Sequence, residues 1–223
     1  MLTAPGLCWL CRMPLACSHW GICSLCSRAM RPAGKVCPLC GLPAAHAEVE
    51  CGRCLQKPPP WRQLIAVSHY TPPLSTLLQQ FKFLPRPEAA HALARLLLLA
   101  LRSRGAGKPD LIISVPLHAR RQWRRGFNQS DLLCRALSRW LQSRYDPATL
   151  SRRRATPVQH HLSARLRKQN LKNAFRLELP VAGLHIAVVD DVVTTGSTVA
   201  EISRLLLRSG AATVQVWCLC RTL

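Results

Sequence analysis

The stretch that decides the fold is Leu184-His-Ile-Ala-Val-Val-Asp-Asp-Val-Val-Thr-Thr-Gly-Ser-Thr198. Its apolar run, residues 186–189, predicts a buried strand, and the apolar spacing over residues 199–207 predicts a helix. Two adjacent acids, Asp190 and Asp191, follow the strand, and a turn of small residues precedes the helix. In open α/β sheets, ligands bind at the carboxyl ends of the strands, and a helix N-terminus binds anions. The stretch therefore predicts a parallel α/β sheet with a binding site at one edge.

This stretch resembles the phosphoribosyl pyrophosphate motif of the type I phosphoribosyltransferases, which consists of four apolar residues, two acids, a spacer and a Thr/Gly/Ser loop. The resemblance implies that Asp190 and Asp191 hold the ribose hydroxyls, and that one of them also contacts magnesium, directly or through water. It also implies a loop for the 5′-phosphate, made of Thr194, Thr195, Gly196, Ser197 and Thr198. The alternative is an ordinary strand–turn–helix unit with two solvated acids.

Positive charge is concentrated in the middle of the chain. The 223 residues have a formal net charge of +21, and residues 102–176 hold 18 Lys and Arg against three acids. Such a surplus favours polyanionic partners, namely pyrophosphate, nucleotides or nucleic acid, although a basic surface that serves only solubility is the alternative. Clustered guanidinium groups repel one another unless they share an anion. We therefore predict binding of pyrophosphate or DNA by Arg120, Arg121, Arg124 and Arg125. Trp123 and Phe127, which lie among them, either stack on bases or anchor the loop.

Eight of the twelve cysteines form four CxxC pairs within the first 54 residues. Each pair can present two thiolates to one ion, and two pairs complete a tetrahedral zinc site. The spacing favours zinc over an iron–sulfur cluster and predicts two structural zinc ions. The simplest arrangement joins the first two pairs and the last two, and crossed or nested arrangements stay open. The predicted ligands are Cys8, Cys11, Cys23, Cys26, Cys37, Cys40, Cys51 and Cys54.

The order of motifs predicts a double zinc ribbon at residues 1–57, a proline-rich linker at 58–62 and a phosphoribosyltransferase-like domain at 63–223. The fold class is α/β, with a parallel sheet flanked by helices and preceded by the small zinc-ribbon domain. We expect strands at 63–70, 110–115, 148–151, 177–179, 184–189 and 213–219. We expect helices at 73–83, 88–104, from Asn128 or Ser130 to 141, after 163 and at 199–207.

Residues 152–175 are polar and basic, and they predict a flap over the site. His160 and His161, within this segment, are either exposed flap residues or a general acid or base.

Almost the whole chain resembles the ComF family, which joins an N-terminal zinc ribbon to a phosphoribosyltransferase-like domain. The resemblance rests on the CxxC pairs, on residues 124–129 and 156–175, and on the segment from Asp190 to Gly196. It implies a role in handling DNA taken up by the cell, in competence or in the use of DNA as a nutrient. The partners implied are phosphoribosyl pyrophosphate with magnesium, single-stranded DNA and proteins of the DNA-uptake machinery.

Two functional hypotheses follow. In the first, the protein binds phosphoribosyl pyrophosphate and serves DNA uptake or utilisation, and it is a phosphoribosyltransferase if it has an acceptor, which would be a nucleobase or another amine. The sequence identifies neither acceptor nor catalytic residue. In the second, it is a non-catalytic factor that binds single-stranded DNA and uses the phosphoribosyl site only for regulation. No secretory signal is evident, and the apolar run around 96–101 is too short to span a bilayer. We therefore expect a cytoplasmic protein without membrane insertion.

Overall fold

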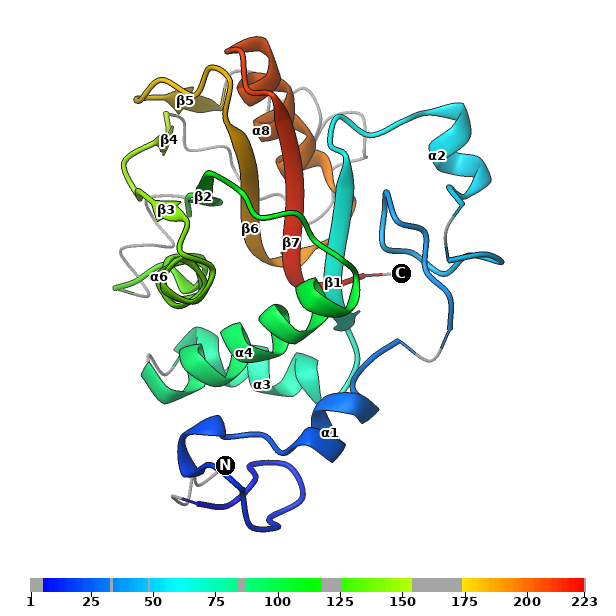
Figure 1. Cartoon of the computed structure of the whole chain (residues 1–223), viewed down its shortest axis with the longest axis vertical. Coiled ribbons are helices and arrows are strands. Elements are labelled where there is room, and N and C mark those ends of the chain that lie inside the picture. Colours follow the sequence, from blue (N-terminus) through cyan, green and yellow to red (C-terminus); the bar gives the residue numbers. More distant parts are fainter. Residues whose placement is uncertain are drawn as a thin grey trace.

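The computed structural model describes residues 6–32, 34–47, 49–83, 87–117, 126–153 and 174–222. Within these residues, five parallel strands form one sheet in the order β1-β7-β6-β2-β3. Their bounds are β1 Gln63–His69, β2 Leu111–Ser114, β3 Arg144–Tyr145, β6 His185–Val193 and β7 Thr213–Arg221. The central position of β6 and β7 places the stretch around Asp190 in the middle of the sheet (Figure 1).

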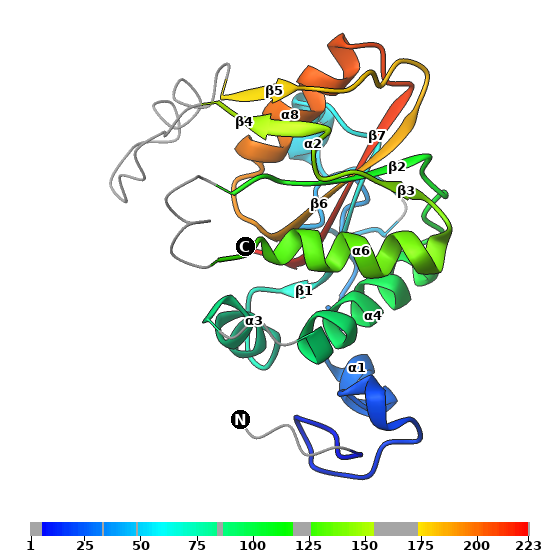
Figure 2. The same cartoon turned by 90° about the vertical axis from the view of Figure 1, so that its left-hand side faces the viewer.

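Helices cover both faces of the sheet (Figure 2). On one face lie α3 Leu74–Phe83, α4 Pro87–Ser103 and α6 Gln129–Leu141. On the other lie α8 Ser197–Arg208 and a small antiparallel sheet of β4 Leu150–Arg152 and β5 Phe175–Leu177. The apolar run of β6 contributes side chains to the hydrophobic cores on both faces of the sheet, because alternate residues of a strand point to opposite sides. Ala187 and Val189 join the core under α4 and α6, and Ile186 and Val188 join the core under α8.

The cysteine-rich part forms two units that lie against different regions of the sheet domain (Figure 1). The first unit holds the 3-10 helix η1 Ser18–Trp20 and α1 Ser24–Ala29, and it packs against α4. There the Arg95 guanidinium donates to the carbonyl of Ile22 at 2.9 Å. The second unit holds α2 Gly52–Gln56 and lies along β1, where the Leu64 N–H donates to the carbonyl of Pro38 at 3.0 Å.

The structure confirms the predicted fold class, a parallel sheet flanked by helices and preceded by the cysteine units. β6 is longer than the predicted strand at 184–189, because its pairing with β7 continues to Val193 opposite Arg221. The strand expected at 177–179 is instead β5, which ends at Leu177 and pairs with β4. The proposed flap and its helix after 163 fall largely on 154–173, outside the described residues. The domain limits 1–57, 58–62 and 63–223 stay a prediction.

None of the described helices combines the length and the apolar character that crossing a bilayer requires.

Candidate functional site

The eight predicted metal ligands gather into two groups of four cysteines, which confirms the simplest pairing of the CxxC motifs. Within each group the four Sγ atoms lie within 4.8 Å of one another. The separation is 3.7 Å between Cys11 and Cys23 and also between Cys40 and Cys51. Four sulfurs placed tetrahedrally around one zinc at about 2.3 Å lie about 3.8 Å apart. Each group can therefore hold a single zinc ion. Cys17 belongs to neither group.

Backbone N–H groups prepare the thiols for metal binding. The Cys23 N–H points at the Cys8 sulfur and the Cys51 N–H at the Cys37 sulfur, each at 3.4 Å. Burial opposes ionisation of Cys8, but hydrogen bonds from the N–H groups of Cys11, Cys23 and Leu10 and from the Cys11 thiol together outweigh it and lower the pKa of Cys8 to about 6. Burial and the neighbouring thiols raise the pKa of Cys26. Without metal, Cys8 thus favours the thiolate and Cys26 the thiol. A bound zinc removes this difference, because its charge keeps all coordinating thiols deprotonated.

At the carboxyl end of β6, the two predicted ribose-binding acids are held by their own backbone. The N–H of Asp191 donates to Oδ1 of Asp190 at 2.9 Å, and the N–H of Val192 donates to Oδ1 of Asp191 at 2.8 Å. Both acids are half-buried. The carboxylates are thus oriented within the last part of β6, which ends at Val193 before the turn that leads into α8.

The predicted phosphate loop joins β6 to the N-terminus of α8. Gly196 has φ of 78° and immediately precedes the helix, a left-handed conformation that glycine adopts without steric cost. The Thr195 and Ser197 hydroxyls lie 2.9 Å apart. Neither Asp nor Glu occurs in the first turn of α8, so no acidic side chain of that turn offsets the positive end of the helix dipole. The turn combines helix-terminal backbone donors and hydroxyls, which is the chemistry of an anion site.

Arg221, which the sequence analysis missed, holds this loop in place through hydrogen bonds to its backbone. Its side chain is buried, with 7% exposure, and donates to the carbonyls of Val193 at 3.0 Å and of Thr194. Its Nε also donates to the carbonyl of Cys40 at 2.9 Å. Burial lowers the pKa of Arg221. A charged residue directly after the apolar run 216–220 was the available signal for a buried guanidinium.

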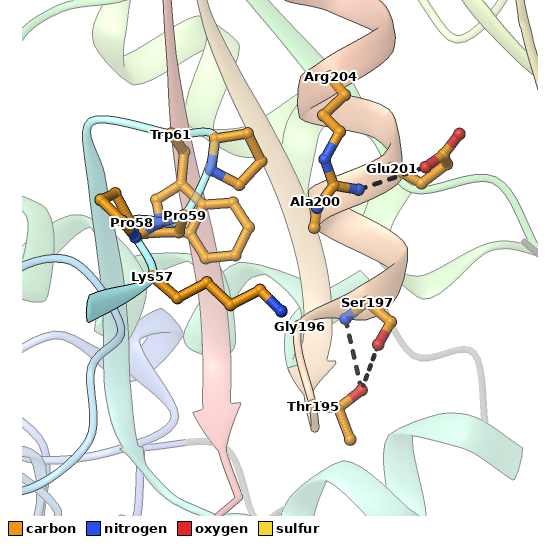
Figure 3. A pocket seen from close by; sticks show the side chains of 11 residues that line it. Lys57, Pro58, Pro59, Trp61, Thr195, Gly196, Ser197, Ala200, Glu201 and Arg204 are labelled. Carbon is orange, nitrogen blue, oxygen red and sulfur yellow. Dashed lines mark hydrogen bonds and ion pairs between the residues drawn. The ribbon is translucent and has the colours of Figure 1, made fainter. Parts of the chain in front are cut away.

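A pocket of about 230 Å³ lies beside the loop, between α8 and the proline-rich linker (Figure 3). Its walls are residues 57–61, residues 195–197, and Ala200, Glu201 and Arg204 of α8. The Trp61 indole donates to the carbonyl of Leu39 at 2.6 Å, which fixes the linker to the second cysteine unit. The sequence analysis interpreted residues 58–62 only as a spacer, and missed that residues 58–61 line a pocket.

The remaining predicted residues are placed only in part. Arg120, Arg121, Arg124 and Arg125 lie outside the described residues, as do Trp123, His160 and His161. Phe127 packs edge-on against Phe81, with ring centroids 6.2 Å apart, which favours an anchoring role for this ring. Asn128 caps α6 by accepting from the Ser130 N–H at 3.1 Å.

Comparison with known proteins gives relatives over the full length of the chain. DNA utilization protein YhgH of Salmonella typhimurium is 70% identical over 227 residues, which span 100% of both chains. Competence protein F of Haemophilus influenzae is 43% identical over 223 residues and 96% of each chain. The chain belongs to the ComF family. The family assignment rests on these relatives, and no family model matches the chain.

Among solved structures, the ComF-family chain is similar to glutamine phosphoribosylpyrophosphate amidotransferase of Bacillus subtilis. The TM-score is 0.41 at 21% sequence identity, over 62% of this chain and 30% of the amidotransferase chain.

Proposed function

We propose that this ComF-family protein binds phosphoribosyl pyrophosphate with magnesium at the edge of the sheet between β6 and α8, and that it serves the uptake or utilisation of DNA. The observation that carries the binding proposal is that Asp190 and Asp191, oriented by backbone N–H groups, lie in the last part of β6, which leads through the turn 194–196 into α8, a helix whose first turn has no acidic residue. The names of the relatives, which refer to DNA utilization and competence, support the biological role.

Each part of the site has a distinct task in this proposal. The loop 194–198 offers N–H and hydroxyl donors to the 5′-phosphate, and the two carboxylates accept from the ribose hydroxyls. Magnesium prefers oxygen ligands and is usually held by one or two carboxylates together with substrate phosphates, so Asp190 and Asp191 suit it. When bound, the ion neutralises charge on the pyrophosphate. The proposal concerns binding; transfer to an acceptor is a separate step for which the described residues identify no activating base.

Calorimetric titration of phosphoribosyl pyrophosphate with magnesium tests the proposal. We expect binding by the wild type and a loss of affinity of about tenfold or more for Asp190→Asn/Asp191→Asn, because two charged acceptors are removed. Glu88→Gln is the matched control, since it removes an exposed carboxylate from α4 on the opposite face of the sheet. Absence of binding by the wild type, or equal affinity of wild type and double variant, contradicts the proposal.

A second function is favoured by the charge of the chain. A surplus of 15 positive charges over residues 102–176 exceeds what one phosphorylated sugar requires, and it supports binding of single-stranded DNA. Salt separates the two functions. If about six phosphates are contacted, the logarithm of the affinity for oligo(dT) falls with a slope of about −4 against the logarithm of salt concentration. An affinity for oligo(dT) that does not change with salt contradicts this second function.

A further inference from the structure

The pocket lies between the linker, which carries both Trp61 and Lys57, and the loop 195–197 with the start of α8 (Figure 3). The Trp61 indole lies on the linker side and is fixed by its 2.6 Å hydrogen bond to Leu39. Gly196 lies opposite: a Cβ atom there would be 3.4 Å from the Trp61 ring. The ring and the loop 195–197 are therefore held at a defined separation. This separation is maintained by the second cysteine unit and not by the sheet alone.

Charge differs between the two ends of the pocket. The Lys57 side chain extends from the linker toward Gly196 and Ser197 (Figure 3). In the described part of the chain, Lys57 forms no ion pair. At the other end, the carboxylate of Glu201 is paired with Arg204 at 3.3 Å. The pocket as a whole is therefore cationic, and its unpaired positive charge lies at the end next to the loop.

We propose that this pocket binds a nucleotide, free or as one unit of single-stranded DNA, with its phosphate between Lys57 and the loop 195–197 and its base against Trp61. A phosphate alone would use the ammonium group and the loop but leave the indole without a role. An aromatic base adds stacking, which works for any base because each has a π face. At about 230 Å³ the pocket is smaller than the roughly 300–1,000 Å³ of sites that enclose drug-sized ligands. It therefore suits a single nucleotide unit that extends partly into solvent.

This inference rests on the proposed function in one respect, that the loop 195–197 accepts a phosphate. It adds a ligand class and two residues from outside the β6–α8 unit. Lys57 and Trp61 belong to the segment that leads from the second cysteine unit into β1. A bound nucleotide would contact this segment and α8 at once, so the cysteine-rich part would contribute directly to recognition.

The test is calorimetric titration of full-length, zinc-loaded protein with deoxyadenosine 5′-monophosphate, deoxyadenosine, inorganic phosphate and oligo(dT). We expect Lys57→Gln to weaken binding of the monophosphate by about five- to tenfold, because a charged hydrogen-bond donor is lost. Lys57→Arg should restore most of the affinity. Lys35→Gln, which removes an exposed lysine of the second cysteine unit outside the pocket, should have no effect.

The role of Trp61 is tested with Trp61→Leu and Trp61→Phe, with zinc content and melting temperature as checks of folding. Trp61→Leu should weaken binding of the monophosphate more than binding of inorganic phosphate, and Trp61→Phe should weaken it less. If Trp61→Leu does not fold, the comparison of Lys57→Gln with Lys57→Arg decides whether the pocket binds the nucleotide. Weakening of oligo(dT) binding by the same variants identifies DNA as the source of the nucleotide, and weakening of the monophosphate alone identifies free nucleotides.

Two results overturn the inference: unchanged affinity of the Lys57 and Trp61 variants, or equal affinity for deoxyadenosine and its monophosphate. Wild-type protein that binds phosphoribosyl pyrophosphate but no nucleotide overturns only the pocket. Protein that binds the monophosphate through Lys57 but not phosphoribosyl pyrophosphate overturns only the phosphoribosyl proposal.

Discussion

The guanidinium of Arg221 donates to the backbone carbonyl of Cys40 at 2.9 Å, and so joins the last strand of the sheet to a predicted zinc ligand. The same side chain donates to the carbonyls of Val193 and Thr194, where β6 ends and the loop begins. One buried charge thus connects the second cysteine unit with the candidate phosphate loop. All these partners are backbone carbonyls: Cys40 accepts from Nε, and Val193 and Thr194 accept from one terminal nitrogen of the guanidinium.

Replacing this residue is expected to affect stability and ligand binding together. Arg221→Met leaves several carbonyls without a donor and should lower the free energy of unfolding by roughly 2–4 kcal/mol. Arg221→Lys keeps the charge but cannot reach carbonyls on both sides, so it should recover only part of the loss. Urea denaturation measures the stability, and calorimetry measures the affinity of the loop for phosphoribosyl pyrophosphate. Wild-type values of both for Arg221→Met would contradict the proposed connection.

The two cysteine groups should differ in their effect on the loop. Metal analysis should find about two zinc ions per wild-type chain and about one in either Cys11→Ser or Cys54→Ser. Only Cys54→Ser should increase hydrogen exchange in the loop 194–196, because only the second group contains Cys40, the partner of Arg221. Cys11→Ser serves as the matched control, since its group packs against α4. Equal exchange in the two variants would show that the loop does not depend on the second group.

Glycine at position 196 is expected to matter for two separable reasons. Gly196→Ala imposes a left-handed φ of 78° on a residue with a Cβ, at a cost of about 1 kcal/mol, and places that Cβ 3.4 Å from Trp61. Gly183→Ala is the matched control: its φ is 75°, and nothing lies within 4 Å of the added Cβ. Both variants should lose similar backbone stability in urea denaturation. Only Gly196→Ala should also lose affinity for phosphate ligands, and equal affinities would argue against a role of this turn in binding.

The sequence predicted the parts of the molecule whose chemistry is local. The CxxC spacing identified all eight clustered cysteines, and the apolar run at 186–189 identified the central strand, because each pattern depends on neighbouring residues. The start of α6 was predicted at Asn128 or Ser130 for the same reason, since a cap acts on the helix that follows it, and the structure identifies Asn128 as the cap. Arg221 was missed because its partner Cys40 lies 181 residues away. Lys57 and Trp61 were missed because a run of prolines predicts a linker and does not show which surface the linker crosses.

Acid should weaken the contact between the first cysteine unit and α4. His91 of α4 lies edge-on to Trp140 at 4.8 Å and to His19 at 5.8 Å between ring centroids. Burial, together with the positive charges of His19 and Arg95, lowers the pKa of His91. The unfolded chain therefore takes up this proton more readily than the folded one, so the stabilising contribution is complete above about pH 6.5 and declines as pH falls through that value.

Urea denaturation at pH 5 and pH 8 measures this effect. His91→Gln should reduce the difference in stability between the two pH values, because it removes the group that the folded protein resists protonating. Zinc ligands also become protonated in acid, but this affects wild type and variant alike, so the change in the difference reports on His91. The control is His46→Gln, which replaces an exposed histidine of the second cysteine unit and should preserve the wild-type difference. The same pH difference in His91→Gln as in the wild type would place the acid sensitivity elsewhere, most simply in the two zinc sites.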